Sequence, residues 1–160
     1  GARYVFGKID QKEISGRIRL DWTFTPKLSL QVFLQPLISV GKYSEFKELA
    51  KPKTYSFNRY GQNGSAISYS GGVYTVDPDG TGPATPFSFD NPDFNFKSLR
   101  GNAVLRWEYM PGSTLYLVWT QSRVNLTDPG DFHFGRDFKS LFSSQPENIF
   151  LVKISYWWNP

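Results

Sequence analysis

The chain has 160 residues, 39% of them hydrophobic and 18% aromatic, and a formal net charge of +4 at pH 7. Its length suits a single domain, and no window approaches the roughly 18 consecutive apolar residues of a membrane-spanning helix. The absence of cysteine excludes disulfides and thiolate metal sites. The sequence has no basic run and no RNA-binding aromatic motif, so it gives no support for nucleic-acid binding.

Two alternating segments, residues 14–24 and 28–40, form the first strong pattern. Every second residue of 14–24 is apolar except Gly16, and the residues between them are polar. After a turn at Pro26 the alternation continues through 28–40, where Pro36 is expected to mark a bulge or a strand edge because proline has no N–H to donate. This period of two predicts β-strands. The first segment also has the length of a tilted membrane-crossing strand, about 9–11 residues.

A long polar region, about residues 42–97, follows these strands. It is rich in glycine, proline and aspartate and is expected to be mainly loop, with a small hairpin around Gly71 and Gly72. Asp77 and Asp79 alternate before a glycine as carboxylates do in calcium loops, but the closing glutamate of an EF-hand is absent and an ordinary turn has the same pattern. The aromatic residues of this region could stack on sugars or pack the loop onto itself.

Three further strands are predicted at about residues 99–109, 114–123 and 149–158. A second long loop, about 124–148, separates the last two and contains His133, the only histidine. Without a second histidine or a cysteine, His133 lacks the partners of a zinc site or a catalytic triad. Helical periodicity is almost absent from the chain.

The same hairpin pattern occurs twice. Each copy is an alternating strand that gains a tryptophan and a second aromatic residue, turns at Pro26 or Pro111, and returns as another alternating strand; the second turn is expected to be two residues longer. Short turns thus alternate with long loops, as the periplasmic turns and extracellular loops of outer-membrane barrels do. Six aromatic residues would form part of the belt at the periplasmic membrane interface. They are Trp22, Phe24, Trp107, Tyr109, Tyr156 and Trp158.

Charged residues fall on the polar faces of the predicted strands. Those expected to line a barrel interior are Arg17, Arg19, Asp21, Arg100, Arg106, Glu108 and Lys153. Asp21 and Glu108 occupy near-equivalent places in the two hairpins. A glycosidase would need two such carboxylates about 5–10 Å apart. Alternatively, Asp21 and Glu108 would form salt bridges with the basic residues of the barrel interior. If bases outnumber the acids that pair with them, the interior would be positive and would favour anions.

These patterns predict an all-β fold over residues 1–160, an antiparallel transmembrane β-barrel. A soluble sandwich or barrel also has alternating strands, so the pattern alone leaves both open. Five strands are odd in number and fewer than the eight of the smallest bacterial barrels, and an open edge in lipid costs several kcal/mol for each unpaired backbone group. The chain is therefore expected to be the C-terminal portion of a larger barrel, with residues 3–10 in an upper loop or strand end. Upstream strands or other subunits would close it.

Five segments carry a family resemblance: residues 28–31, 46–53, 74–80, 93–123 and 150–157, of which 93–123 is the most specific. Together they resemble the C-terminal part of a bacterial outer-membrane family of unassigned function, whose members pair an N-terminal domain similar to family-nine carbohydrate-binding modules with a C-terminal β-barrel. The resemblance implies an outer-membrane barrel and brings no catalytic residue. The carbohydrate-binding-like domain is missing here. Barrels commonly end on an aromatic residue, so a final residue or two is also expected to be absent.

The functional expectation is a non-enzymatic protein of the bacterial outer membrane, in contact with its lipid. It would be a surface platform, a receptor or passage for a polysaccharide or small solute, or a subunit of a cell-surface assembly. A soluble, aromatic-rich β-domain that binds carbohydrate is the alternative, followed by an outer-membrane hydrolase. No cofactor is expected apart from the calcium candidate.

Overall fold

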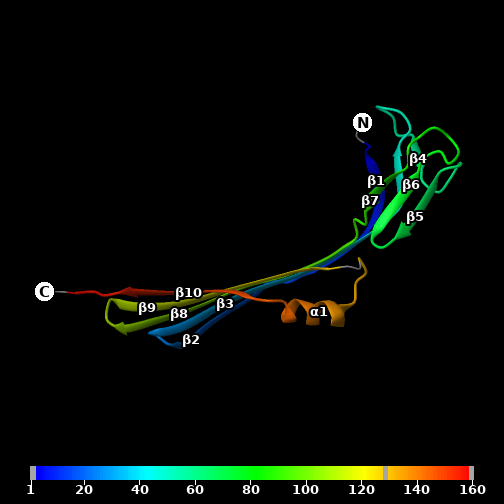
Figure 1. The fold of residues 1–160 in the computed structure, drawn as a ribbon. Helices are drawn as coiled ribbons and strands as arrows, with labels where there is room; N and C mark the ends of the chain where they lie inside the picture. The colour runs from blue at the N-terminus through cyan, green and yellow to red at the C-terminus, as the bar shows by residue number, and fades with distance from the viewer. Residues whose placement is uncertain (1–2, 128–129, 159–160) are drawn as a thin grey trace. The chain divides into compact units, whose positions relative to one another are not determined.

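The computed structural model describes residues 3–127 and 130–158 and consists mainly of antiparallel β-sheet (Figure 1). The all-β antiparallel prediction is confirmed. The strands are β1 (Val5–Ser15), β2 (Ile18–Thr25), β3 (Leu28–Leu49), β4 (Phe57–Arg59), β5 (Ala66–Ser70), β6 (Val73–Asp77), β7 (Phe87–Asp90), β8 (Phe94–Met110), β9 (Ser113–Thr127) and β10 (Glu147–Ser155). The helix α1 (Phe134–Ser143) lies between β9 and β10 in the chain.

The chain divides into two compact units, and β1, β3 and β8 contribute residues to both. The first, which we call the loop unit, comprises residues 3–11, 41–94 and 130–131 of the described chain. The second, the long-strand unit, comprises residues 12–40, 95–127 and 132–158. The long-strand unit contains all of β2, β9, β10 and α1, together with residues 28–40 of β3 and 95–110 of β8.

The main sheet is open. Its strand order is β1-β3-β8-β9-β10, and β2 and β4 also pair with β3. In the described part of the chain, β10 pairs with neither β1 nor β2, so no closed barrel is formed. No helix within residues 3–127 and 130–158 is long and apolar enough to cross a membrane.

The repeated hairpin of the sequence forms twice with the same geometry. Thr25 pairs with Leu28 across the first turn and Met110 with Ser113 across the second. Each turn therefore has two residues, and the prediction of a longer second turn is wrong. The apolar alternation of the second copy simply starts later, because Ser113 takes the place of a leucine and its hydroxyl accepts the Trp157 N–H at 3.0 Å. Each hairpin also has a bulge at its second aromatic residue, which increases the local strand twist.

Several strand bounds differ from the prediction. The expected strand at 14–24 is divided between β1 and β2, and residues 3–10 lie largely in β1. Pro36 lies within β3 rather than at an edge. Its carbonyl accepts the Gly16 N–H at 3.0 Å, but proline cannot return a hydrogen bond, so the neighbouring strand breaks at this point. β9 extends past residue 123 to Thr127, and β10 covers Glu147–Ser155 instead of 149–158.

The loop unit contains far more strand than the prediction for residues 42–97. β3 continues into it, β4 pairs with β3, and β5, β6 and β7 form a separate three-stranded sheet. The hairpin predicted around Gly71 and Gly72 is confirmed, and both glycines have the positive φ that such a two-residue turn needs. Strands β4 and β7 were missed because they have only three and four residues, too few for a reliable alternating pattern. Phe87 and Phe89 of β7 pack against the cluster of Phe46, Tyr60 and Val76.

The helix α1 was also missed, since residues 124–148 were expected to be loop. Three phenylalanines repeat every fourth residue, at Phe134, Phe138 and Phe142, and so lie along one side of the helix. The buried residues of α1 are Asp137 and Leu141. Together with Leu141, the phenylalanines have the i, i+4, i+7, i+8 spacing of an amphipathic helix, so the sequence does contain a helical signal and the loop prediction for this segment is wrong.

Candidate functional site

The strand register gathers apolar side chains on one face of the long-strand unit. Directly paired residues of an antiparallel sheet point to the same side. In the first hairpin Leu20 pairs with Val32. In the second, Leu105 pairs with Leu117, which in turn pairs with Val152 of β10. Each hairpin therefore presents its apolar alternation as a continuous surface.

The two hairpins join on this same face. A Cβ atom on Gly101 of β8 would lie 2.9 Å from Cδ2 of Leu34 on β3, so the two residues are in close contact across the strands. We call the combined surface the apolar face. Its members by register are Ile18, Leu20, Trp22, Leu30, Val32, Leu34, Gly101, Ala103, Leu105, Trp107, Leu115, Leu117, Trp119, Phe150, Val152 and Ile154.

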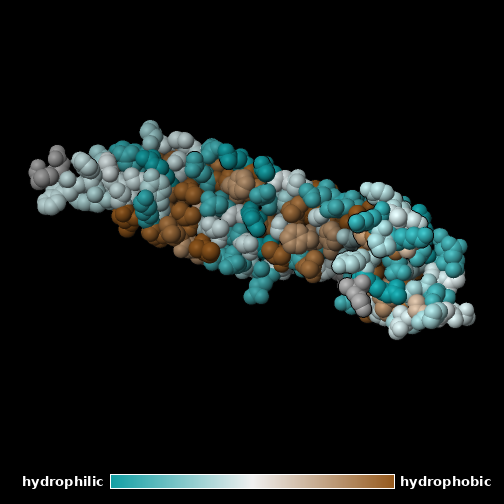
Figure 2. All heavy atoms as spheres, turned by 90° about the horizontal axis from the view of Figure 1, so that it is seen from above, coloured by the Kyte–Doolittle hydropathy of each residue, from teal (hydrophilic) through white to brown (hydrophobic). Residues whose placement is uncertain are grey.

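Much of the apolar face is exposed. Trp22 has 55% of its surface accessible, Ile154 68% and Phe150 75%. In Figure 2, hydrophobic side chains gather over the long-strand unit, with hydrophilic side chains between them. Soluble monomers rarely expose contiguous apolar patches larger than a few hundred Å². The apolar face is therefore a candidate site of contact with a membrane or with an apolar protein surface.

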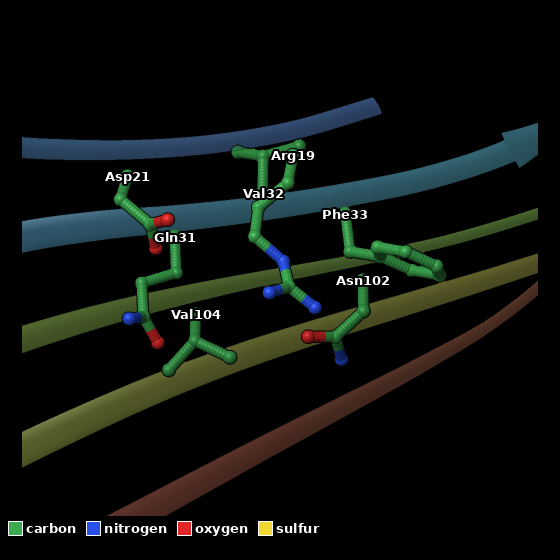
Figure 3. Close-up of a pocket in the computed structure, with 7 residues that line it drawn as sticks. All are labelled: Arg19, Asp21, Gln31, Val32, Phe33, Asn102 and Val104. Carbon is green, nitrogen blue, oxygen red and sulfur yellow. The ribbon is translucent and has the colours of Figure 1, made fainter. Parts of the chain in front are cut away.

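The opposite, polar face contains a hollow of about 480 Å³ formed by β2, β3 and β8 (Figure 3). Arg19 pairs with Phe33, and Asp21 pairs with Gln31, so a cation lies beside an aromatic ring and a carboxylate beside an amide. Figure 3 shows the side chains of Gln31, Phe33 and Asn102 extending to the same side of the strands. The hollow is lined by Arg19, Asp21, Gln31, Phe33, Asn102 and Val104, together with Val32, which lies between Gln31 and Phe33 in β3 and by register has its side chain on the apolar face. Donors, acceptors and a ring edge are the groups by which polar ligands are oriented.

The two carboxylates considered as a glycosidase pair do not converge. Asp21 is level with Gln31, whereas the Glu108 N–H donates to the Lys27 carbonyl at 2.8 Å. Gln31 and Lys27 are four residues apart on β3, so Asp21 and Glu108 are about 14 Å apart along the strand direction at 3.4 Å per residue. This distance exceeds the separation of the two carboxylates in glycoside hydrolases. Glu108 instead forms an ion pair with Arg106, at 3.6 Å.

The remaining predicted interior charges are spread over the polar side of the unit. Arg17 lies in the break between β1 and β2. Arg100 and Glu147 both pair with Ser122 of β9, so Glu147, which the sequence patterns did not single out, lies level with Arg100. The Nζ atom of Lys153 lies 5.9 Å from the centre of a tyrosine ring on β9. With Glu147 included, bases still outnumber acids in this set, which favours a positive potential.

The six predicted interface aromatics lie near the two-residue turns. Within each hairpin the two rings touch, with 5.5 Å between ring centres in the first and 6.1 Å in the second. The Tyr109 hydroxyl donates to the Ser155 carbonyl at the end of β10, at 3.3 Å. Tyr156 and Trp158 follow directly in the chain. The long-strand unit thus brings these residues to one end of its strands, while their contact with a membrane stays a prediction.

Asp77 and Asp79 belong to the loop unit and shape the turn after β6. Oδ1 of Asp77 accepts the Gly80 N–H at 2.8 Å, and Oδ2 of Asp79 accepts the Ala84 N–H at 3.0 Å. Aspartates commonly order turns in this way. Among the described residues, no three histidine, cysteine, aspartate or glutamate side chains are grouped so that they could hold a metal ion. Calcium binding at this turn stays a prediction.

An open antiparallel sheet with one apolar face and one polar face defines the chain as an all-β protein of long amphipathic strands. The chain belongs to the family described as a domain of unknown function (DUF5916), whose model matches residues 1–159. No curated protein matches the chain, and no solved structure matches it.

Proposed function

We propose that the chain forms part of an antiparallel β-barrel in the bacterial outer membrane, with the apolar face in lipid and the polar face lining the interior. The observation that carries this proposal is the continuity of the apolar face across β2, β3, β8, β9 and β10. Strands that are apolar on one side and polar on the other are typical of transmembrane barrels.

The strand lengths support the same function. β8 has 17 residues and β9 has 15, more than the about 9–11 that a tilted strand needs to cross the hydrocarbon core. The surplus extends beyond the membrane on the side away from the two-residue turns, where barrel strands run on into long loops.

The open edges require further strands. Within the described residues, β2 pairs only with β3 and β10 only with β9. In lipid each unpaired N–H or C=O group costs several kcal/mol. The proposal therefore includes additional strands that pair with these edges, supplied by the same polypeptide or by other subunits.

The proposed role is non-enzymatic: a surface platform, a receptor or passage for a polysaccharide or small solute, or a subunit of a cell-surface assembly. The hollow beside Arg19, Gln31 and Asn102 supports contact with a polar solute. The excess of bases on the polar face supports a preference for anions. Single-channel recordings on the complete barrel test this preference, and a cation-selective channel would contradict it.

Membrane fractionation tests the proposed location. The full-length protein is expected to sediment with outer membranes and to be released by detergent, but not by alkaline carbonate or urea, which remove proteins held at the surface by polar contacts. Recovery of folded protein in the soluble fraction would contradict the proposal.

A further inference from the structure

The helix α1 is attached to the same side of the sheet as the apolar face. Trp119 of that face donates through Nε1 to Asn148 Oδ1 at 2.9 Å, and Gln121 donates to the same oxygen at 3.0 Å. Arg123 continues the row by donating to Gln121 Oε1 at 3.1 Å and also donates to the carbonyl of Phe142 in α1. A chain of hydrogen bonds therefore leads along one face from Trp119 to the helix.

The inner side of α1 is held by polar contacts. Asp137 is fully buried and accepts a hydrogen bond from Nδ2 of Asn95 on β8, at 3.0 Å. The Ser140 hydroxyl lies 3.1 Å from Oδ1 of Asn125 on β9. Buried Lys97 donates to the same Asn125 oxygen at 2.9 Å. The helix thus covers the stretch in which β8 and β9 become polar on this side of the sheet.

One flank of α1, next to its buried side, is aromatic and exposed. Phe134, Phe138 and Phe142 form a continuous row, with 5.4 and 4.7 Å between successive ring centres. Their exposed fractions are 57%, 42% and 47%. Packing within the described chain does not account for three exposed phenylalanines in a row, whereas amphipathic helices at membrane interfaces carry such a stripe.

The height of α1 along the strands fits the second membrane interface. Leu115 pairs with Trp107 near the turns, and Arg123, which contacts α1, lies eight residues further along β9. This separation is about 27 Å along the strand at 3.4 Å per residue, or about 21 Å along the membrane normal at a tilt of about 40°. Asn125, which also contacts α1, lies about 26 Å from Leu115 along the membrane normal at the same tilt. The apolar band of outer-membrane barrels is about 25 Å tall.

We propose that α1 is an interfacial helix whose phenylalanine row enters the outer-membrane lipid at the interface opposite the two-residue turns, where it replaces the polar surface of β8 and β9 by an apolar one. This inference rests on the proposed function, because it needs the apolar face to meet lipid. Lipid is the occupant that continuity favours, since α1 extends the apolar face on the same side.

Site-directed fluorescence in vesicles tests the proposal, and the absence of cysteine from these 160 residues leaves each introduced cysteine as a unique label here. The full-length protein is labelled with NBD at Phe138→Cys on the row, at the adjacent exposed Lys139→Cys, and at Val152→Cys on the apolar face. It is then reconstituted into phosphatidylcholine vesicles that contain nitroxide-labelled lipid. Phe142→Cys serves as a second position on the row if the first variant folds poorly.

The expected result is a blue-shifted, strongly quenched signal at position 138 with the nitroxide near the headgroup. Position 152 should be quenched more by a nitroxide deep in the acyl chain, and position 139 should be quenched least. Quenching at 152 without quenching at 138 would overturn the interfacial helix and leave the proposed function standing. A blue shift at 138 without quenching, as a protein partner or second copy would cause, would overturn it as well. Loss of quenching at all three positions would contradict the proposed function itself.

Discussion

Leu105 and Val104 are neighbours on β8 that face opposite surroundings. Leu105 belongs to the apolar face, whereas Val104 lines the hollow on the polar face. If the apolar face meets lipid, Leu105→Arg at mid-bilayer should lower the free energy of unfolding by about 2–4 kcal/mol. Val104→Arg adds the same charge one residue away and should cost much less. Urea unfolding of the vesicle-reconstituted protein measures both, and equal losses would show that the faces are assigned wrongly.

The stability with which α1 packs on the sheet is expected to depend on pH through the carboxyl group of Asp137. Burial alone would raise the pKa of this carboxyl, but hydrogen bonds from the Arg136 side chain, the His133 N–H and the Asn95 amide outweigh it and hold the pKa below its usual 3.8. Buried Lys97 is the other charged group nearby. A carboxyl whose pKa is lowered by folding stabilises the folded state at pH values above its unfolded pKa. That stabilisation is lost as the pH falls through the folded pKa.

We therefore expect α1 to loosen in acid and Asp137→Asn to remove most of this dependence. At pH 7 the variant should lose about 1–3 kcal/mol of local stability because a charged hydrogen-bond partner is removed from a buried site. Hydrogen exchange of the α1 amides, measured between neutral pH and pH 2, reports the local opening free energy. The same acid dependence in the variant and the unaltered protein would exclude Asp137 as its source.

Among the elements, the second turn and helix α1 each contain a glycine, and the two positions differ in whether they can accept a side chain. Gly112 has a φ of 75°, and a Cβ there would lie 3.0 Å from Cβ of Trp157. Gly112→Ala should therefore destabilise the hairpin by about 1–2 kcal/mol. Gly135 lies in α1, where an added Cβ would meet no side chain within 4 Å beyond its chain neighbours, so Gly135→Ala should stabilise the helix by up to about 1 kcal/mol. Local hydrogen exchange separates the two effects, and a shared sign would contradict this account of the turn.

The elements also differ in how well the sequence predicts them. The hairpins around Pro26 and Pro111 were predictable because period-two alternation over long segments is a strong signal. Helix α1 was predictable as well, from the i, i+4, i+7, i+8 spacing of apolar residues at positions 134, 138, 141 and 142, which the loop prediction disregarded. The hollow was not predictable, although Arg19 and Asp21 were singled out. Its shape depends on the register that brings Phe33 and Asn102 beside them, and alternation within a strand carries no register between strands.

For the whole molecule, the exposed apolar face and the open sheet edges are both explained by a closed barrel in lipid. A large exposed apolar surface needs lipid or a partner, and edges within lipid need pairing. A closed barrel with further strands meets both conditions at once. A soluble domain would have to cover the apolar face with another layer, whereas Trp22, Phe150 and Ile154 of that face are more than half exposed and α1 contacts the same side next to β9.

Heat-modifiable migration on an SDS gel tests the central claim most directly. A closed barrel keeps its compact shape in SDS until it is boiled, because its backbone hydrogen bonds are all satisfied within the strands. The full-length protein, extracted from membranes in mild detergent, should migrate faster before boiling than after it. Identical migration in both samples, from a protein that stays folded and monomeric in detergent-free buffer, would contradict the barrel.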